Sequence, residues 1–196
     1  MKKIGLTGGI ASGKSSVGLI LEKMGVRVIS ADSVAHKILE PGEAAYHQVV
    51  AEFGLGILDG QGRIDRKKLG RLVFGNERLR KRLEELTHPV IIAVIKETID
   101  FYERSGLQLV VIEIPLLFEV GLRELVDEIW VVTVDSREQF RRLMLRDQIS
   151  EEEAKSRIAA QLPLAEKEKL ADVVIQNNQT LEDLEAQVRA LIKDYF

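Results

Sequence analysis

The sequence predicts an α/β fold in which a parallel sheet of five strands is flanked by helices. Two observations support this prediction. First, segments with helical periodicity separate short apolar runs that we interpret as strands. Strands that alternate with helices indicate right-handed crossover connections. The runs themselves are rich in valine and isoleucine and apolar at their centres on both faces, which is typical of parallel strands covered on both sides. They are Lys3–Thr7, Arg27–Ser30, Leu109–Ile114, Glu128–Val134 and Val173–Gln176.

The composition limits the kinds of function to consider. The chain has 196 residues, 45% hydrophobic and 30% charged, which is enough for one compact domain with a small insertion. It contains no cysteine, so disulfides, thiol catalysis and cysteine-bound metals are excluded. The net charge of −3 argues against a general nucleic-acid binder.

The sequence gives no sign of a membrane segment. The apolar run that would follow a basic start in a signal peptide is interrupted at Gly5 and again at Gly8 and Gly9. The most apolar stretch, 107–122, contains Glu113 and Glu119 and is too short to span a bilayer. We therefore expect a cytoplasmic protein without a membrane partner.

The most informative motif lies between the first strand and the helix predicted from Ser16 to Met24. Residues 8–15 read GGIASGKS, which matches the phosphate-binding P-loop pattern G-x-x-x-x-G-K-[ST]. Glycines let backbone amides approach phosphate oxygens, and Lys14 supplies a compact cation. The motif predicts a P-loop NTPase fold that binds ATP. The residues expected to contact it here are Gly9, Ile10, Ala11, Ser12, Gly13, Lys14, Ser15 and Ser16.

Two oxygen donors predict a Mg²⁺ site beside the P-loop. Ser15 offers a hydroxyl, and Glu113 stands at the end of the apolar third strand, where P-loop proteins keep a carboxylate for Mg²⁺. Pro115 stops this strand from continuing. The apolar residues Leu116, Leu117 and Phe118 that follow are interpreted on periodicity alone as core, and Glu119 either contacts substrate or caps a turn.

Asp32 follows directly on the second strand. Ligands of doubly wound sheets gather beyond the carboxyl ends of the strands, so this carboxylate is a candidate to accept a proton from an acceptor hydroxyl. The alternative is an N-cap for a helix that starts at Ser33, which is a frequent role of aspartate. Position alone leaves both interpretations open.

A charged segment after the fourth strand predicts a mobile lid. Arg142 and Arg146 are four residues apart and share one face of a predicted helix, where they could neutralise a transferring phosphoryl group. The alternative is a solvated face that pairs with Glu138 and Asp147. Such lids exclude water and so suppress hydrolysis of ATP.

A long insertion separates the second and third strands. Three amphipathic helices are predicted there, over Arg66–Phe74, Asn76–Leu86 and Pro89–Glu103, with His88 just before the start of the third. After the fifth strand, Asn177 and Asn178 lie where a nucleotide base could bind or where the chain simply turns. The amphipathic stretch from Leu181 to Ile192 predicts a closing helix with Thr180 as its N-cap.

Several segments taken together resemble the dephospho-coenzyme A kinase family, over essentially the whole chain. They are residues 5–15, Ala31-Asp32 with His36, His88-Pro89, Pro115–Glu119, Gln139 with Arg142, Arg146-Asp147, Ala154 with Arg157-Ile158 and Gln161, and Ala171-Asp172 leading to Asn177. The resemblance implies ATP-dependent phosphorylation of the ribose 3′-hydroxyl of dephospho-CoA. It also implies three parts: a core (1–40, 106–136 and 162–196), a helical substrate lobe (41–105) and a lid (137–161).

The resemblance assigns roles to individual residues. It implies that Asp32, Lys14 and Arg142 are catalytic, that Arg146 lies on the lid side of the phosphates, and that Asn177 lies near the adenine. It places the acceptor near Asp32, His36, His88, Leu116 and Phe118. The expected small-molecule partners are ATP and dephospho-CoA, with Mg²⁺ as cofactor and no nucleic acid. The oligomeric state is left open.

Three other functions are alternatives to this one. Another small-molecule P-loop kinase would share the core and differ in the inserted lobe. A GTP-dependent switch would usually carry Asn-Lys-x-Asp after a strand, and the sequence has no such motif. A non-catalytic nucleotide-binding regulator would not need the combination of Lys14, Asp32 and the lid arginines.

Overall fold

The computed structural model describes residues 1–195, which divide into two compact units. The first unit combines Met1–Ser30 with the chain from Tyr102 onward, and the second consists of Ala31–Phe101. Residues 31–40, which the sequence groups with the core, cluster with the second unit.

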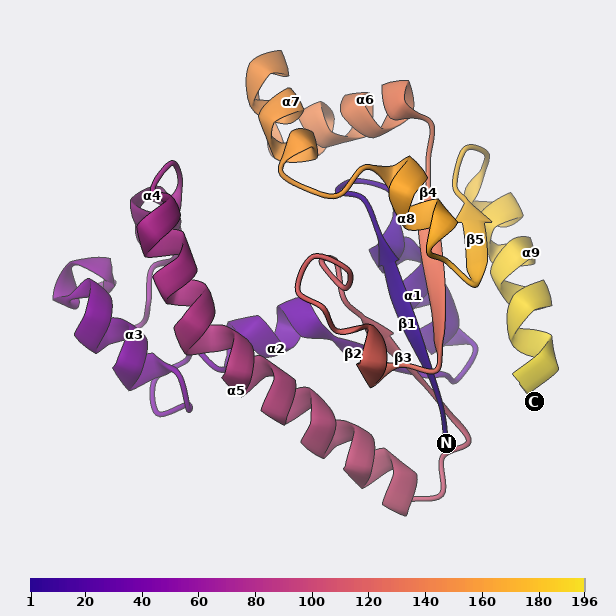
Figure 1. Cartoon of the computed structure of the whole chain (residues 1–196), viewed down its shortest axis with the longest axis horizontal. Coiled ribbons are helices and arrows are strands. Elements are labelled where there is room, and N and C mark those ends of the chain that lie inside the picture. Colours follow the sequence, from indigo (N-terminus) through magenta and orange to yellow (C-terminus); the bar gives the residue numbers. More distant parts are fainter. Residues whose placement is uncertain (196) are drawn as a thin grey trace. The chain divides into compact units, whose positions relative to one another are not determined.

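A five-stranded parallel sheet forms the centre of the first unit (Figure 1). Its order is β2-β3-β1-β4-β5, with β1 in the middle and β2 and β5 at the edges. All four pairings are parallel. The predicted sheet is confirmed, and each strand lies within one residue of its expected bounds: β1 Lys2–Gly8, β2 Arg27–Ser30, β3 Leu109–Glu113, β4 Glu128–Thr133 and β5 Val173–Gln176.

Two helices cover one face of this sheet. Side chains of α1 (Lys14–Lys23) and α9 (Leu181–Ile192) pack with Ile4, Leu6 and Trp130 into one buried apolar cluster. On the other face Gly5 leaves space for a neighbour, because a Cβ there would come within 2.7 Å of Leu117 Cδ1. Both faces are therefore covered, which explains why the strands read as nearly continuous apolar runs.

The ends of the helices in this unit follow local sequence signals. Thr180 caps α9 in a capping box with Asp183, as expected. The charged segment after β4 folds as α6 (Ser136–Asp147), α7 (Glu151–Ala159) and α8 (Leu164–Lys169). Ser150 caps α7, and Gln148 ends α6 in a left-handed conformation with φ of 53°.

The second unit is helical. It contains α2 (Ala31–Lys37), α3 (Tyr46–Phe53), a 3-10 turn at Leu55–Ile57, α4 (Arg66–Val73) and α5 (Glu77–Arg104), whose last three residues belong to the first unit. A small core of Val49, Ile57, Ile64 and Leu69 holds these elements together. Within residues 1–195 no helix is both long and apolar enough to cross a membrane.

Two details differ from the sequence-based expectation. The two helices predicted on either side of Pro89 are one helix, α5, so His88 lies inside a helix and not at its start. Proline removes only one backbone hydrogen bond, and Pro89 sits on the exposed side of a helix that still buries Thr87, Ile95 and Ile99. In addition, α2 begins at Ala31, so Asp32 belongs to its first turn and is not an N-cap.

Candidate active site

The P-loop connects the carboxyl end of the central strand β1 to the N-terminus of α1. Gly13 is the residue before the helix and has φ of 98°, in the region that favours glycine. A Cβ on Gly13 would come within 2.0 Å of Asn177 Nδ2, so space as well as conformation requires glycine here. The loop is thereby packed directly against the segment that follows β5.

Lys14 is held inside this loop. Its side chain is largely buried, and its ammonium group donates to the carbonyl oxygens of Gly9 at 3.1 Å and Gly8 at 3.4 Å. Ala11 has φ of 58°, which a residue with a Cβ adopts only at a cost in energy. Strained backbone of this kind is found where a loop is shaped for a ligand.

Ser15 and Glu113 lie side by side. The Ser15 hydroxyl donates to Glu113 Oε1 at 3.1 Å, which joins the first turn of α1 to the end of β3. A hydroxyl and a carboxylate are hard oxygen donors, and Mg²⁺ is commonly held by one or two such groups together with phosphates. No group of three or more acidic or histidine side chains suited to a metal occurs in the described part of the chain, so this pair fits Mg²⁺ only if a ligand supplies further oxygens.

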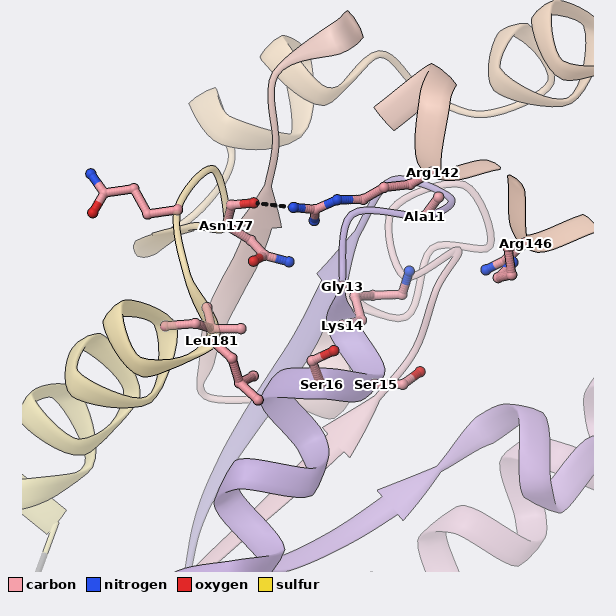
Figure 2. Close-up of a pocket in the computed structure, with 11 residues that line it drawn as sticks. Ala11, Gly13, Lys14, Ser15, Ser16, Arg142, Arg146, Asn177 and Leu181 are labelled. Carbon is pink, nitrogen blue, oxygen red and sulfur yellow. Dashed lines mark hydrogen bonds between the residues drawn. The ribbon is translucent and has the colours of Figure 1, made fainter. Parts of the chain in front are cut away.

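A cavity of about 530 Å³ opens beside the P-loop (Figure 2). This volume is within the usual range for small-molecule sites. Eight of the predicted site residues line it: Ala11, Gly13, Lys14, Ser15, Ser16, Arg142, Arg146 and Asn177. The cavity is also lined by Gln179, Leu181 and Leu184, for which no role was predicted. The available signal was that the turn after β5 and the start of α9 follow the carboxyl end of a strand.

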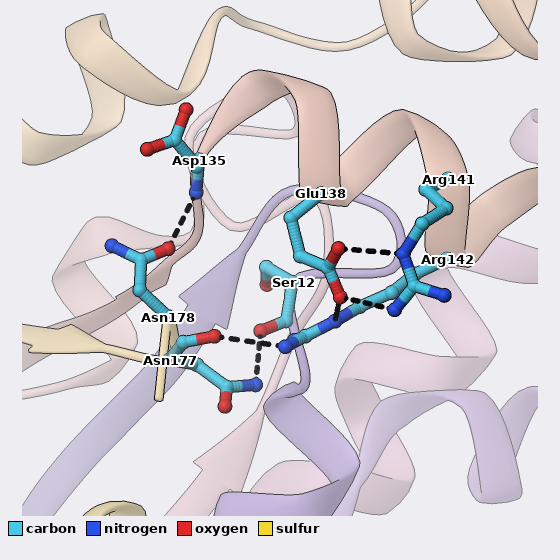
Figure 3. A network of polar contacts seen from close by, with 7 residues as sticks. All are labelled: Ser12, Asp135, Glu138, Arg141, Arg142, Asn177 and Asn178. Atoms are coloured by element: carbon cyan, nitrogen blue, oxygen red, sulfur yellow. Dashed lines mark hydrogen bonds and ion pairs between the residues drawn. The ribbon is translucent and has the colours of Figure 1, made fainter. Parts of the chain in front are cut away.

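Arg142 is oriented by polar partners at two positions (Figure 3). Its Nε donates to Glu138 Oε1 at 2.8 Å, and its terminal nitrogen donates to the Asn177 carbonyl oxygen at 3.1 Å. Arg141 pairs with the same carboxylate at 2.6 Å. Hydrogen bonds from Arg141 and Arg142 lower the pKa of Glu138 to about 2. Glu138 is therefore ionised at neutral pH and fixes the direction of Arg142.

Arg146 is paired with its neighbour in sequence. Its Nε donates to Asp147 at 2.7 Å, and Arg157 donates to the same carboxylate at 2.9 Å. The hydrogen bond from Arg146 holds the pKa of Asp147 below its usual value. The two interpretations of the arginines are thus compatible, because Arg142 and Arg146 pair with acidic neighbours and also line the cavity.

The two asparagines after β5 both support the site. The Asn177 side chain, largely buried, donates to the Ser12 carbonyl oxygen at 2.8 Å. Asn178 accepts from the backbone N–H of Asp135 at 2.7 Å, at the start of α6 (Figure 3). Ser12 is itself fully buried, and its hydroxyl has no hydrogen-bond partner within residues 1–195.

The segment after β3 is tied to α8. Leu117 is fully buried, as expected for core, whereas Leu116 is 38% exposed and Phe118 is half-buried. Glu119 pairs at 2.8 Å with the buried Lys167 and accepts from Leu162 N–H at 3.0 Å. Burial raises the pKa of Glu119, but these contacts outweigh it and the net pKa is lowered. Glu119 therefore has a structural partner on α8.

The remaining predicted residues belong to the second unit. Asp32 and His36 are exposed and four residues apart on α2, so they share one face of that helix. His88 is half-buried in α5. The first unit therefore contains the predicted phosphate and Mg²⁺ residues, and the second contains these three.

Known proteins resemble the whole chain. The sequence model of the dephospho-CoA kinase family matches residues 2–183. The dephospho-CoA kinase of Geobacillus kaustophilus is 51% identical over 192 residues, covering 98% of this chain and 96% of the relative. Two solved structures also match, TT1252 from Thermus thermophilus (37% identity, 98% and 97% coverage, TM-score 0.79) and the dephospho-CoA kinase of Campylobacter jejuni (35%, 99% and 97%, TM-score 0.75). This chain therefore belongs to the dephospho-CoA kinase family.

Proposed function

We propose that the chain transfers the γ-phosphoryl group of ATP to the ribose 3′-hydroxyl of dephospho-CoA, giving coenzyme A and ADP. The observation that carries this proposal is the P-loop cavity, which gathers Lys14, Arg142 and Arg146 in a chain whose family is named for this reaction. In the transfer, the acceptor oxygen bonds to the γ-phosphorus as the bond to the ADP oxygen breaks. The acceptor hydroxyl proton is lost, and ADP leaves on the opposite side.

On the donor side the residues position phosphates and balance charge. Lys14 binds the β- and γ-phosphates, and the amides at the N-terminus of α1 add donors. Arg142 and Arg146 stabilise the negative charge that develops on the transferring phosphoryl group, and the lid at 137–161 excludes water. Phosphoryl transfer depends mainly on positioning and charge stabilisation, and these side chains supply both.

Ser15 and Glu113 are the residues that would hold Mg²⁺. A Mg²⁺ ion held there would neutralise negative charge on the donor phosphates. The adjacent hydroxyl and carboxylate, 3.1 Å apart, support this assignment.

The nucleotide base and the acceptor complete the proposal. Asn177 lies near the adenine, with Leu181 and Leu184 supplying an apolar wall in the same cavity. Asp32 orients the 3′-hydroxyl and receives its proton, and His36, His88, Leu116 and Phe118 contact the acceptor. The residues of 41–105 form the substrate lobe, and the enzyme acts in the cytoplasm. The family resemblance supports these assignments.

An ADP-production assay with a panel of acceptors tests the function. With ATP and Mg²⁺, we expect rapid ADP release with dephospho-CoA and little with adenosine, AMP, shikimate or gluconate. Preference for one of the other acceptors would replace the proposal with a different small-molecule kinase. ADP release that does not depend on any acceptor would contradict both the proposed reaction and the alternative of a different small-molecule kinase.

A further inference from the structure

The backbone of Ile10 is held by two side chains. Its carbonyl oxygen accepts from Gln139 Nε2 at 2.9 Å, and its N–H donates to Gln161 Oε1 at 2.8 Å. Gln139 lies in α6, and Gln161 lies two residues beyond the end of α7. Side chains from both ends of the α6–α7 segment therefore bind one residue of the P-loop.

Local packing shows that this arrangement is closely fitted. Gln139 is polar but only 6% exposed, so burying its amide would be costly without the hydrogen bond that it makes. A Cβ on Gly9 would come within 2.6 Å of Gln139 Nε2, so the glutamine fits only because the loop carries glycine at that position. The P-loop pattern G-x-x-x-x-G-K-[ST] itself leaves position 9 open.

The contacts also change the role expected of Ile10. Its N–H is already bound by Gln161, so it contributes shape to the loop and not a hydrogen bond to phosphate. The next residue, Ala11, has the strained φ of 58° and lines the cavity. Strain of this kind persists only where surrounding contacts hold it.

We propose that Gln139 and Gln161 are positioning residues that clamp the Ile10 backbone on both sides of its Cα, hold Ala11 in its left-handed conformation and so shape the loop for the donor phosphates. Because both lie in the lid segment 137–161, one near each end, the clamp also couples the lid to the loop. This inference rests on the proposed ATP-dependent function and deepens it. Neither glutamine contacts the reacting atoms in this assignment.

The two hydrogen bonds run in opposite directions, which provides a sharp test. Gln161 acts as an acceptor, and a glutamate carboxylate accepts equally well, so Gln161→Glu keeps the bond. Gln139 acts as a donor, and in Gln139→Glu the carboxylate would face the Ile10 carbonyl oxygen without a proton to share. The two substitutions add the same charge beside the backbone of the same residue.

The measurement is binding of MgADP to the full chain by isothermal titration calorimetry. We expect Gln139→Glu to weaken binding about tenfold and Gln161→Ala about fivefold, and Gln161→Glu to stay within about twofold of the unmodified protein. Gln108→Glu is the matched charge control, because Gln108 is exposed and precedes the amino end of β3, away from the P-loop. Equal losses in the two glutamate variants, or no loss in either, would overturn the clamp.

Two further measurements separate positioning from loss of folding. Gln139→Met keeps the size of the side chain without a new charge, and we expect it to weaken MgADP binding like Gln139→Glu while circular dichroism stays native. In steady-state assays the KM for ATP should rise while the KM for dephospho-CoA is unchanged. A rise in both KM values would contradict the proposal. ADP binding needs no acceptor, so it tests the clamp even if dephospho-CoA proves not to be the substrate.

Discussion

At the scale of single residues, Lys14 shows how a requirement of function can oppose stability. Its largely buried ammonium group loses hydration and donates to the Gly8 and Gly9 carbonyl oxygens. We expect Lys14→Met to lower kcat/KM for ATP by about 10²- to 10³-fold, because one charged donor to the phosphates is lost. The free energy of unfolding of the nucleotide-free chain, measured in urea, should not fall. A destabilised variant would show that Lys14 has mainly a structural role.

Asp32 makes a different prediction because it lies in the first turn of α2 and is not a cap. Asp32→Asn should lower kcat with dephospho-CoA by about 10²- to 10⁴-fold, since a proton acceptor is lost. The MgADP dissociation constant should stay the same, and stability should change by no more than about 1 kcal/mol through the helix dipole. Turnover close to that of the unmodified chain would remove Asp32 from the mechanism.

The sequence predicted the P-loop residues from a contiguous motif and missed the contacts that Gln161 and Glu119 make with distant residues. Gly13, Lys14 and Ser15 follow from a contiguous motif, because loop shape and helix start are set within a few residues. The contact of Gln161 with Ile10 joins residues 151 positions apart, and that of Glu119 with Leu162 joins residues 43 apart. No local pattern encodes such pairs, since each depends on how the finished sheet brings loops together.

At the scale of elements, Pro89 shows where a local rule fails. The sequence pattern predicted that one helix ends and another begins there, but a single helix of 28 residues, α5, runs through Pro89. We expect Pro89→Ala to raise the free energy of unfolding by about 1–3 kcal/mol, because alanine restores the missing N–H and relieves the clash with the preceding turn. Urea unfolding followed by circular dichroism measures this. An unchanged or lowered stability would mean that the ring of Pro89 makes compensating contacts.

The end of α6 offers a second element-level prediction. Gln148 is exposed and left-handed at φ of 53°, a position where glycine is common. Gln148→Gly should stabilise the chain by about 0.5–1 kcal/mol, since the Cβ strain disappears and a Gly-capped helix end forms more easily. The melting temperature checks it, with Gln48→Gly inside α3 as an exposed control that should be destabilising.

At the scale of the whole molecule, the chain order of the first unit is itself informative. Its sheet takes β1 and β2 from residues before Ala31 and the other strands from residues after Phe101, so the second unit is an insertion into a single sheet. Alternation of apolar runs and helices was enough to predict the five parallel strands. The same periodicity could not predict which side chains meet in the cavity, because that depends on sheet order.

Acid should destabilise the molecule through a defined set of carboxylates. Hydrogen bonds from arginines lower the pKa values of Glu138, to about 2, and of Asp147. A carboxylate whose folded-state pKa is lowered contributes stability above its unfolded-state pKa and loses it as pH falls through the folded-state value. The contribution of these two groups to the free energy of unfolding should therefore be nearly constant from about pH 7 to 5.5 and fall between about pH 5 and 2.

Urea unfolding across this pH range, followed by far-ultraviolet circular dichroism, tests the prediction. In a Glu138→Gln, Asp147→Asn double variant the loss of stability on acidification should be smaller, because two of the responsible groups no longer titrate. The difference in stability between the unmodified chain and this variant should shrink steadily as pH falls. A difference that stays constant with pH would show that the arginine pairs on α6 do not contribute to stability through their charge.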